Sequence, residues 1–310
     1  MKEPWYFGID GGGTHSRLAL VNRQGEVRVQ VTGGSTNIYS VSPEQVFENV
    51  TELLDRGLRE ASLEREDLAG GCIGSAGLGR SGEVRLFRDF LDILLGPDFP
   101  VTLCGDGEIL LCGGLEGLEG YCLIAGTGSL ALGRSADGRL VRAGGLGYLL
   151  GDEGAAAWIG RTAIARTLRS VESRDISTAM LPRLLAACNR EAATDLIAYI
   201  HRDAGKAEIA ALAPAVTAAA QEGDPLAVDI LHTGAEELAL LVRSVMQQSP
   251  WIQNRALVLA GGVMEHDPIV SGKLKALLAR EFPELVVMLP RKTALEGACL
   301  LAVSSGAGKR

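Results

Sequence analysis

Short apolar runs bounded by turn residues open the chain and predict strands. Three of these runs fall within the first 32 residues, namely WYFGID at 5–10, SRLALVN at 16–22 and EVRVQVT at 26–32. A turn at Asn22–Gly25 joins the last two runs as a hairpin. From Pro43 to about Ala61 the pattern changes, because apolar residues recur there at spacings of three and four, as in an amphipathic helix.

The order of elements then repeats along the chain. Predicted strands at 70–77 and 99–106 flank a helix at about 82–95, so the first half reads βββαβαβ. The second half starts with strands on both sides of a glycine turn within 120–134 and a third at 139–145. It continues with the following predicted elements: alanine- and leucine-rich helices at about 152–250 with a break at 221–227, a strand at 256–262, a helix at about 268–281, a strand at 285–289 and a helix from about 293. This repetition predicts a duplicated α/β unit with a cleft between its copies.

The chain length fits this division. At 310 residues, against roughly 100–200 per domain, the chain is long enough for two domains. We expect an N-terminal α/β domain at 1–117, joined by the C-terminal helix at about 293–310. The C-terminal α/β domain, with its helical insertion, is then expected at 118–292.

Charge and hydropathy exclude several classes of partner. The net charge of −8 and the pI near 5.2 oppose a broad basic surface, so we expect no nucleic-acid partner. No run approaches the ~18 uncharged apolar residues of a membrane helix, so we expect no membrane partner. The six cysteines lie mostly in apolar runs without a C-x-x-C pair, which favours buried thiols in a reducing compartment. With no signal peptide visible at the start, the expected location is the cytoplasm.

Two glycine turns occupy equivalent places in the two halves, DGGGT at 10–14 and AGTGS at 125–129. Both lie between strands, whereas Rossmann and Walker loops lie between a strand and a helix. Glycine NH groups in such turns form concave anion sites, and the hydroxyls of Thr14, Thr127 and Ser129 add donors. A third glycine pair, LAGGV at 259–263, ends a strand at a sheet's carboxyl edge. Any one of them could be an ordinary turn, but together they predict a phosphate-binding site.

These three motifs resemble the two phosphate motifs and the adenosine motif of the actin, sugar kinase and Hsp70 ATPase superfamily. GGSTNI at 33–38 and AGGLGYLLGDEGAAAWIG at 143–160 are similar to the N-acetylglucosamine kinase family, which is grouped with the BadF/BadG/BcrA/BcrD-type ATPases. The resemblance covers nearly the whole chain. It implies an α/β fold of two actin-like (ribonuclease H-like) ATPase domains with a central cleft, and ATP and Mg²⁺ as cofactors.

The resemblance also implies a role for individual residues. Asp10 matches the aspartate that positions Mg²⁺, usually through water. Asp106 matches the catalytic aspartate, which would accept or orient the proton of the attacking sugar hydroxyl. The ATP-binding residues would be Gly11, Gly12, Gly13, Thr14, Gly126, Thr127, Gly128, Ser129, Gly261 and Gly262. The sugar-binding residues would be Ser35, Asn37, Asp106, Gly144, Gly145, Asp152 and Glu153.

Some of these residues have a structural alternative. Asp106 could be a surface aspartate that caps a helix from about 107, and Glu153 could cap the helix that follows it. Leu146 and Ile38 stand where related enzymes carry bulkier aromatic residues, which leaves the size of the sugar pocket open.

The function expected from the resemblance is an ATP-dependent amino-sugar kinase, with the 6-hydroxyl of N-acetylglucosamine as first choice of acceptor. Glucosamine and N-acetylmuramic acid are alternative substrates, and a homodimer is one arrangement left open. An activator ATPase that shares a [4Fe–4S] cluster would need two cysteines after the second phosphate motif, but residues 123–187 contain none. A non-catalytic ATP-binding sensor would not need Asp106 and Asp152 together.

Overall fold

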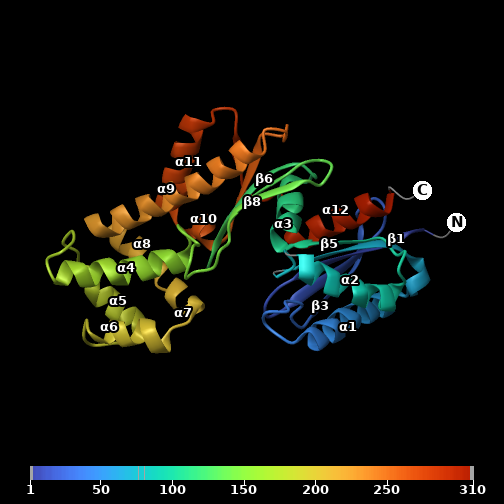
Figure 1. Cartoon of the computed structure of the whole chain (residues 1–310), viewed down its shortest axis with the longest axis horizontal. Helices are drawn as coiled ribbons and strands as arrows, with labels where there is room; N and C mark the ends of the chain where they lie inside the picture. The colour runs from blue at the N-terminus through green and yellow to red at the C-terminus, as the bar shows by residue number, and fades with distance from the viewer. Residues whose placement is uncertain (1–2, 76, 80, 308–310) are drawn as a thin grey trace. The chain divides into compact units, whose positions relative to one another are not determined.

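The computed structural model describes residues 3–75, 77–79 and 81–307. The chain divides into two compact units (Figure 1). Unit 1 comprises Met1–Gly120, Arg134–Gly138 and Pro290–Arg310, and unit 2 comprises Tyr121–Gly133 and Arg139–Leu289. These units differ from the predicted domains, which were divided at 117/118 and 292/293, mainly in residues 134–138. The prediction placed this segment in the C-terminal domain, whereas it belongs to unit 1. There Arg134 donates to the Leu118 carbonyl at 2.7 Å and pairs with Glu108 at 3.4 Å.

Within the described residues, unit 1 contains a five-stranded sheet in the order β3-β2-β1-β4-β5. Its strands are β1 (Trp5–Gly11), β2 (Ser16–Val21), β3 (Val27–Gly33), β4 (Leu68–Ser75) and β5 (Val101–Gly105). Strand β2 is antiparallel to both of its neighbours, β1 and β3, whereas β1, β4 and β5 are parallel. The carboxyl ends of these parallel strands therefore share one edge of the sheet.

Helices cover both faces of this sheet. Figure 1 shows α1 (Pro43–Ala61) and α2 (Ser81–Leu95) on one side, and α3 (Asp106–Leu115) and α12 (Ala294–Ala307) on the other. A short 3₁₀ helix at Arg65–Asp67 precedes β4. Helix α1 begins after Ser42, whose hydroxyl accepts from the Gln45 NH, and its buried stripe includes Val46, Val50 and Leu54. This stripe packs with Phe7 and Ile9 of β1 into a single apolar core.

In the described part of unit 2, another five-stranded sheet has the order β10-β9-β6-β7-β8. Its strands are β6 (Gly120–Ala125), β7 (Ser129–Arg134), β8 (Leu140–Gly144), β9 (Ala256–Ala260) and β10 (Val286–Met288). The helices are α4 (Ala156–Val171), α5 (Leu181–Cys188), α6 (Asp195–Ala198), a π turn at Tyr199–Asp203, α7 (Lys206–Ala210), α8 (Ala213–Gln221), α9 (Pro225–Gln248), α10 (Gly262–His266) and α11 (Pro268–Glu281). The predicted break at 221–227 lies between α8 and α9.

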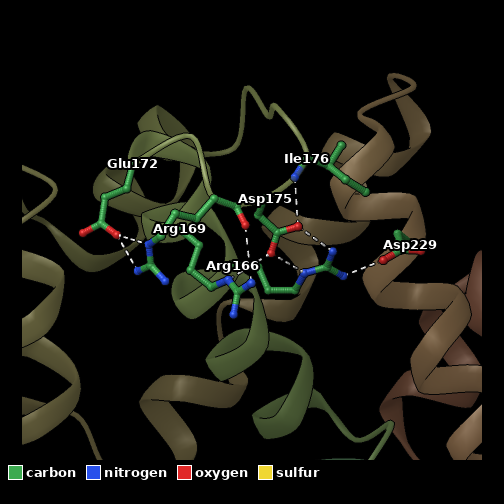
Figure 2. A network of polar contacts seen from close by, with 7 residues as sticks. Arg166, Arg169, Glu172, Asp175, Ile176 and Asp229 are labelled. Atoms are coloured by element: carbon green, nitrogen blue, oxygen red, sulfur yellow. Dashed lines mark hydrogen bonds and ion pairs between the residues drawn. The ribbon is translucent and has the colours of Figure 1, made fainter.

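A polar network connects α4, the loop at residues 175–176 and α9 of unit 2, as Figure 2 shows. Arg166 of α4 donates two hydrogen bonds to Asp175, at 2.8 and 3.0 Å, and a third to Asp229 of α9 at 2.5 Å. The Ile176 NH donates to the same Asp175 carboxylate at 2.9 Å. These hydrogen bonds hold the pKa of Asp175 well below its usual range. The carboxylate thus stays ionised and fixes the loop after α4.

Three further expectations concern the chain as a whole. Each of the six cysteines falls within the described residues, and each is buried and free, as the apolar runs around them predict. No helix in the described ranges is long and apolar enough to cross a membrane. The α/β class and the two sheets predicted from the repeated order of elements are confirmed.

Candidate functional site

In unit 1, the first glycine turn and Asp106 lie at the same edge of the sheet. The register places Gly11 of β1 beside Ser75 of β4, and Ser75 beside Gly105 of β5. Asp10 precedes this row by one residue on β1, and Asp106 follows it by one residue as the first residue of α3. Asp10, predicted to position Mg²⁺, and Asp106, predicted to accept the proton of the sugar hydroxyl, therefore both lie close to this carboxyl edge.

Buried hydroxyl groups pack against the first glycine turn at Gly11. Thr36 Oγ1 lies 3.0 Å from Ser16 Oγ and 3.3 Å from Ser75 Oγ, and Ser75 Oγ also donates to the Thr36 carbonyl at 3.0 Å. A Cβ atom built on Gly11 would lie 2.1 Å from Thr36 Oγ1 and 2.6 Å from Ser75 Oγ. Glycine at position 11 is thus required by the protein's own packing. The packing role of Thr36 and Ser75 was not predicted, although Thr36 lies within the GGSTNI motif and Ser75 within the predicted strand at 70–77.

The outer part of this turn is accessible. The Gly12 NH donates to the His15 carbonyl at 3.1 Å and closes the turn. Gly13 and Thr14 are exposed, so a ligand can reach their donors. ATP binding by Gly11, Gly12, Gly13 and Thr14 remains a prediction that this geometry permits.

Ser35 and Asn37 lie beside the same turn but differ in exposure. Ser35 is 5% exposed, and its hydroxyl donates to the Gly12 carbonyl at 3.0 Å and accepts from the Asn37 NH at 3.2 Å. Asn37 is half-buried, and its side-chain oxygen accepts from the Tyr39 NH at 2.9 Å. Ser35 therefore ties the Asn37 backbone to the glycine turn. A sugar contact by either residue remains a prediction.

Asp10 is the residue predicted to hold Mg²⁺. Its carboxylate is 18% exposed, and Oδ2 lies 2.5 Å from Arg17 Nη2. Mg²⁺ usually keeps several waters and needs only one or two protein carboxylates. No group of three or more His, Cys, Asp or Glu residues that could hold a metal occurs in the described ranges. One carboxylate at a sheet edge fits a largely hydrated Mg²⁺, and Asp10 would bind the ion while it keeps its ion pair with Arg17.

Asp106 is exposed at the amino end of α3. The N-cap position belongs to Gly105, and Asp106 Oδ1 accepts from the Gly107 NH at 2.9 Å. A carboxylate there also interacts favourably with the helix dipole. Because Gly105 is the N-cap, the alternative in which Asp106 caps a helix from about 107 is wrong. As the first residue of α3, Asp106 is either a proton acceptor or a carboxylate that only interacts with the helix dipole, and a substitution separates these two roles.

In unit 2, the second glycine turn connects β6 to β7 and contacts the start of α4. The Gly126 NH donates to the Gly128 carbonyl at 3.0 Å, and the Ala156 NH donates to the Gly126 carbonyl at 2.9 Å. Thr127 is exposed at the tip, whereas Ser129 is only 3% exposed. The Ser129 hydroxyl donates to the Glu153 carbonyl at 2.8 Å. Thr127 can therefore reach a ligand, while Ser129 holds the segment around Glu153.

The third glycine motif reaches this same turn. Gly261 has φ +97°, and a Cβ atom built on it would lie 2.6 Å from the Ala125 carbonyl oxygen. Strand β9 ends at Ala260 and α10 begins at Gly262, so the predicted strand at 256–262 is wrong at its last two residues. Glycine at 261 allows the end of β9 to approach the second glycine turn closely.

A pocket of about 650 Å³ opens between these two motifs. Its volume is in the range of pockets that hold drug-sized ligands. Its walls come from the second glycine turn and from helices α4, α7, α8 and α10, with small side chains on most of them. The residues that define this unit 2 pocket are Gly126, Thr127, Ala156, Ile159, Ala207, Ala210, Ala211, Ala213, Pro214, Thr217, Ala218, Gln221, Gly262, Val263, His266 and Asp267. The two glycine motifs of this pocket were predictable from the sequence, but its alanine-rich walls were not.

Asp152 lies against the second glycine turn. It is 2% exposed, has φ +58°, and its Oδ2 accepts from Lys206 Nζ at 2.9 Å. A Cβ atom built on Gly128 would lie 2.6 Å from Asp152 Oδ2 and 2.8 Å from Lys206 Nζ. Lys206 had no signal in the sequence, because it lies 54 residues from Asp152 in a predicted helical segment without a motif.

Gly144, Gly145 and Glu153 complete the predicted sugar-binding residues of unit 2. The Gly145 NH donates to the Ser129 carbonyl at 2.8 Å, which brings the GG segment next to the second glycine turn. Helix α4 has Ala155 at its N-cap and no side-chain cap bond, so the alternative role of Glu153 as a helix cap is wrong. Sugar binding by these three residues remains a prediction.

Comparison with known proteins gives a consistent result. The family model described as the BadF/BadG/BcrA/BcrD ATPase family matches residues 7–302. An N-acetylmuramic acid/N-acetylglucosamine kinase of Clostridium acetobutylicum is 33% identical, over 97% of this chain and 98% of its own length. An N-acetyl-D-glucosamine kinase of Dictyostelium discoideum is 28% identical over 98% and 99%. The solved structure of a protein from Chromobacterium violaceum, assigned as an N-acetylglucosamine kinase, is 26% identical, covers 97% and 99%, and has a TM-score of 0.72.

The chain belongs to the BadF/BadG/BcrA/BcrD ATPase family. Membership of this family implies the use of ATP.

Proposed function

We propose that the protein is an ATP-dependent amino-sugar kinase that phosphorylates N-acetylglucosamine, with the 6-hydroxyl as acceptor. The observation that carries this proposal is the row Gly11–Ser75–Gly105, which brings Asp106 to the same sheet edge as the first glycine turn. The names of the Clostridium and Dictyostelium relatives, which match nearly the whole chain, support the amino-sugar class.

Phosphoryl transfer depends mainly on positioning and on neutralising charge. In our proposal the adenosine occupies the unit 2 pocket, and the NH groups of the glycine turns hold the phosphates. The sugar oxygen forms a bond to the γ-phosphorus, the bond from that phosphorus to the bridging oxygen breaks, and ADP leaves. Asp106 orients the hydroxyl and accepts its proton.

Mg²⁺ is the metal that we propose for this reaction. Asp10 would hold it, and the bound ion would supply positive charge beside the phosphate oxygens. The Asp10–Arg17 ion pair keeps the carboxylate in place at the sheet edge. We also propose that the reaction takes place in the cytoplasm, where ATP is available and where the six buried thiols would stay reduced.

N-Acetylmuramic acid is a second candidate acceptor. Leu146 is 67% exposed next to the predicted sugar-binding glycines, and its side chain is smaller than the aromatic residue that the resemblance places at this position in related enzymes. A site with this residue has room for a larger substituent on the sugar. The Clostridium relative is named for both sugars.

The test is the release of ADP with Mg²⁺-ATP and one sugar at a time, over glucose, glucosamine, N-acetylglucosamine, N-acetylmannosamine and N-acetylmuramic acid. We expect the highest kcat/KM with N-acetylglucosamine, and two-dimensional ¹H–³¹P NMR of the product should show phosphorus coupled to the protons on carbon 6. ADP release that no sugar stimulates would contradict the kinase proposal.

A further inference from the structure

The ammonium group of Lys206 lies beside the second glycine turn of unit 2. The position that a Cβ atom on Gly128 would take is 2.8 Å from Lys206 Nζ, so the ammonium is next to the backbone of this turn. The next residue, Ala207, lines the unit 2 pocket together with Gly126 and Thr127. Lys206 is therefore located where the pocket meets the glycine turn.

Asp152 holds Lys206 in this position. The two side chains form an ion pair of 2.9 Å, in which the Asp152 side chain is 3% exposed and that of Lys206 is 38% exposed. The start of α7 is also fixed, because Glu208 accepts from the Gly205 NH at 2.9 Å. One partner is anchored inside unit 2, while the other remains accessible from solvent. This asymmetry suits a cation that receives a ligand.

We propose that Lys206 binds a phosphate group of the nucleotide at the second glycine turn, and that Asp152 is its positioning residue. An ammonium group has three N–H donors, so two remain after the bond to Asp152. A phosphate in the turn would receive NH groups from the backbone and a charged donor from Lys206. This inference rests on the part of the proposed function that assigns the glycine turn and the unit 2 pocket to ATP.

The test measures binding of three ligands to the full-length protein, adenosine, Mg²⁺-ADP and the non-hydrolysable analogue Mg²⁺-AMPPNP, by calorimetry or competition. The variants are Lys206→Met, which removes the charge, and Lys206→Arg, which retains it. Hydrogen bonds to charged groups typically correspond to about a 10- to 100-fold change in affinity. We expect Lys206→Met to weaken binding of AMPPNP, or of both ADP and AMPPNP, by that factor. Adenosine binding should stay within twofold, and Lys206→Arg should recover part of the loss.

Two controls separate binding from folding. Lys206→Met leaves the Asp152 carboxylate without its cation, so the double variant Lys206→Met/Asp152→Asn is measured as well, with a thermal melt for each protein. Lys273→Met is a matched control, because Lys273 pairs with Glu236 at 3.6 Å on α11 and α9, outside the pocket lining. We expect this control to bind all three ligands like the parent.

The binding results distinguish failure of the Lys206 proposal from failure of the kinase proposal. If both Lys206→Met and the double variant bind all three ligands like the parent, the Lys206 proposal is wrong. It is also wrong if adenosine, which carries no phosphate, loses as much affinity as AMPPNP. A parent protein that binds AMPPNP but phosphorylates no sugar would contradict the kinase proposal while the Lys206 comparison still stands. A parent that binds none of the three would overturn both.

Discussion

The Ser129 hydroxyl donates a hydrogen bond to the Glu153 carbonyl at 2.8 Å, and so ties the second glycine turn to the GDEG segment. Ser129 is 3% exposed, which favours a structural role over direct contact with ATP. We expect Ser129→Ala to leave a buried carbonyl without this donor and to cost about 1–3 kcal/mol of unfolding free energy. Chemical denaturation measures this loss. A variant as stable as the parent but with much weaker ATP binding would show that Ser129 contacts the nucleotide instead.

Gly11→Ala tests the packing beneath the first glycine turn. The added Cβ atom would lie 2.1 Å from Thr36 Oγ1, so Thr36 or the turn must shift. Overpacking of this kind typically costs about 1–3 kcal/mol, which a denaturation curve would resolve. Gly82→Ala in α2 is the matched control, since nothing lies within 4 Å of its added Cβ, and we expect it to be neutral or slightly stabilising. Equal stability of both variants would refute the close approach at Gly11.

Thr127→Val tests the exposed tip of the second glycine turn. Valine keeps the shape but removes the hydroxyl, which we expect to lower kcat/KM for ATP by roughly 10-fold or more while the melting temperature stays unchanged. Thr127→Ser, which retains the hydroxyl, is the control and should remain near the parent. Unchanged ATP kinetics in Thr127→Val would remove this residue from the site.

The Arg166–Asp175 network predicts a specific pH dependence of stability (Figure 2). Because the folded-state pKa of Asp175 is depressed by Arg166, its stabilising effect is present above the unfolded pKa of about 3.9 and is lost as the pH falls below it. Asp175→Asn should therefore melt at a lower temperature than the parent at pH 7. The difference should shrink below about pH 4.

Glu172→Gln provides the control for this measurement. Glu172 pairs with Arg174, and both side chains are more than half exposed, so this substitution should change the melting temperature little. A melting difference between Asp175→Asn and the parent that stays constant from pH 7 to pH 3 would contradict the assigned role of Asp175.

Local signals in the sequence were sufficient for most of the fold. Helix α1 has the predicted bounds Pro43–Ala61, because the Ser42 cap, the proline after it and a regular apolar stripe all agree. Helix α10 was missed because Gly261 and Gly262 continue an apolar run, and nothing in the sequence distinguishes a strand end from a turn into a five-residue helix.

The candidate site was predictable where it consists of glycine turns and not where it depends on long-range contacts. The DGGGT and AGTGS motifs are local and lie between strands as predicted. The contact of Lys206 with Asp152, and that of Thr36 with Ser75, join residues that only the tertiary structure brings together. The central cleft predicted between the two domains remains a prediction.

Asp106 offers the most direct test of the account. Asp106→Asn keeps the shape of the side chain and can still orient a hydroxyl, but it cannot accept a proton. General-base assistance typically contributes about 10²–10⁴-fold, so kcat with the best sugar should fall by that factor while sugar binding changes much less. Since Gly105 occupies the N-cap position, the thermal melt should stay close to that of the parent. A variant that melts like the parent and retains more than about a tenth of its kcat would contradict the catalytic assignment.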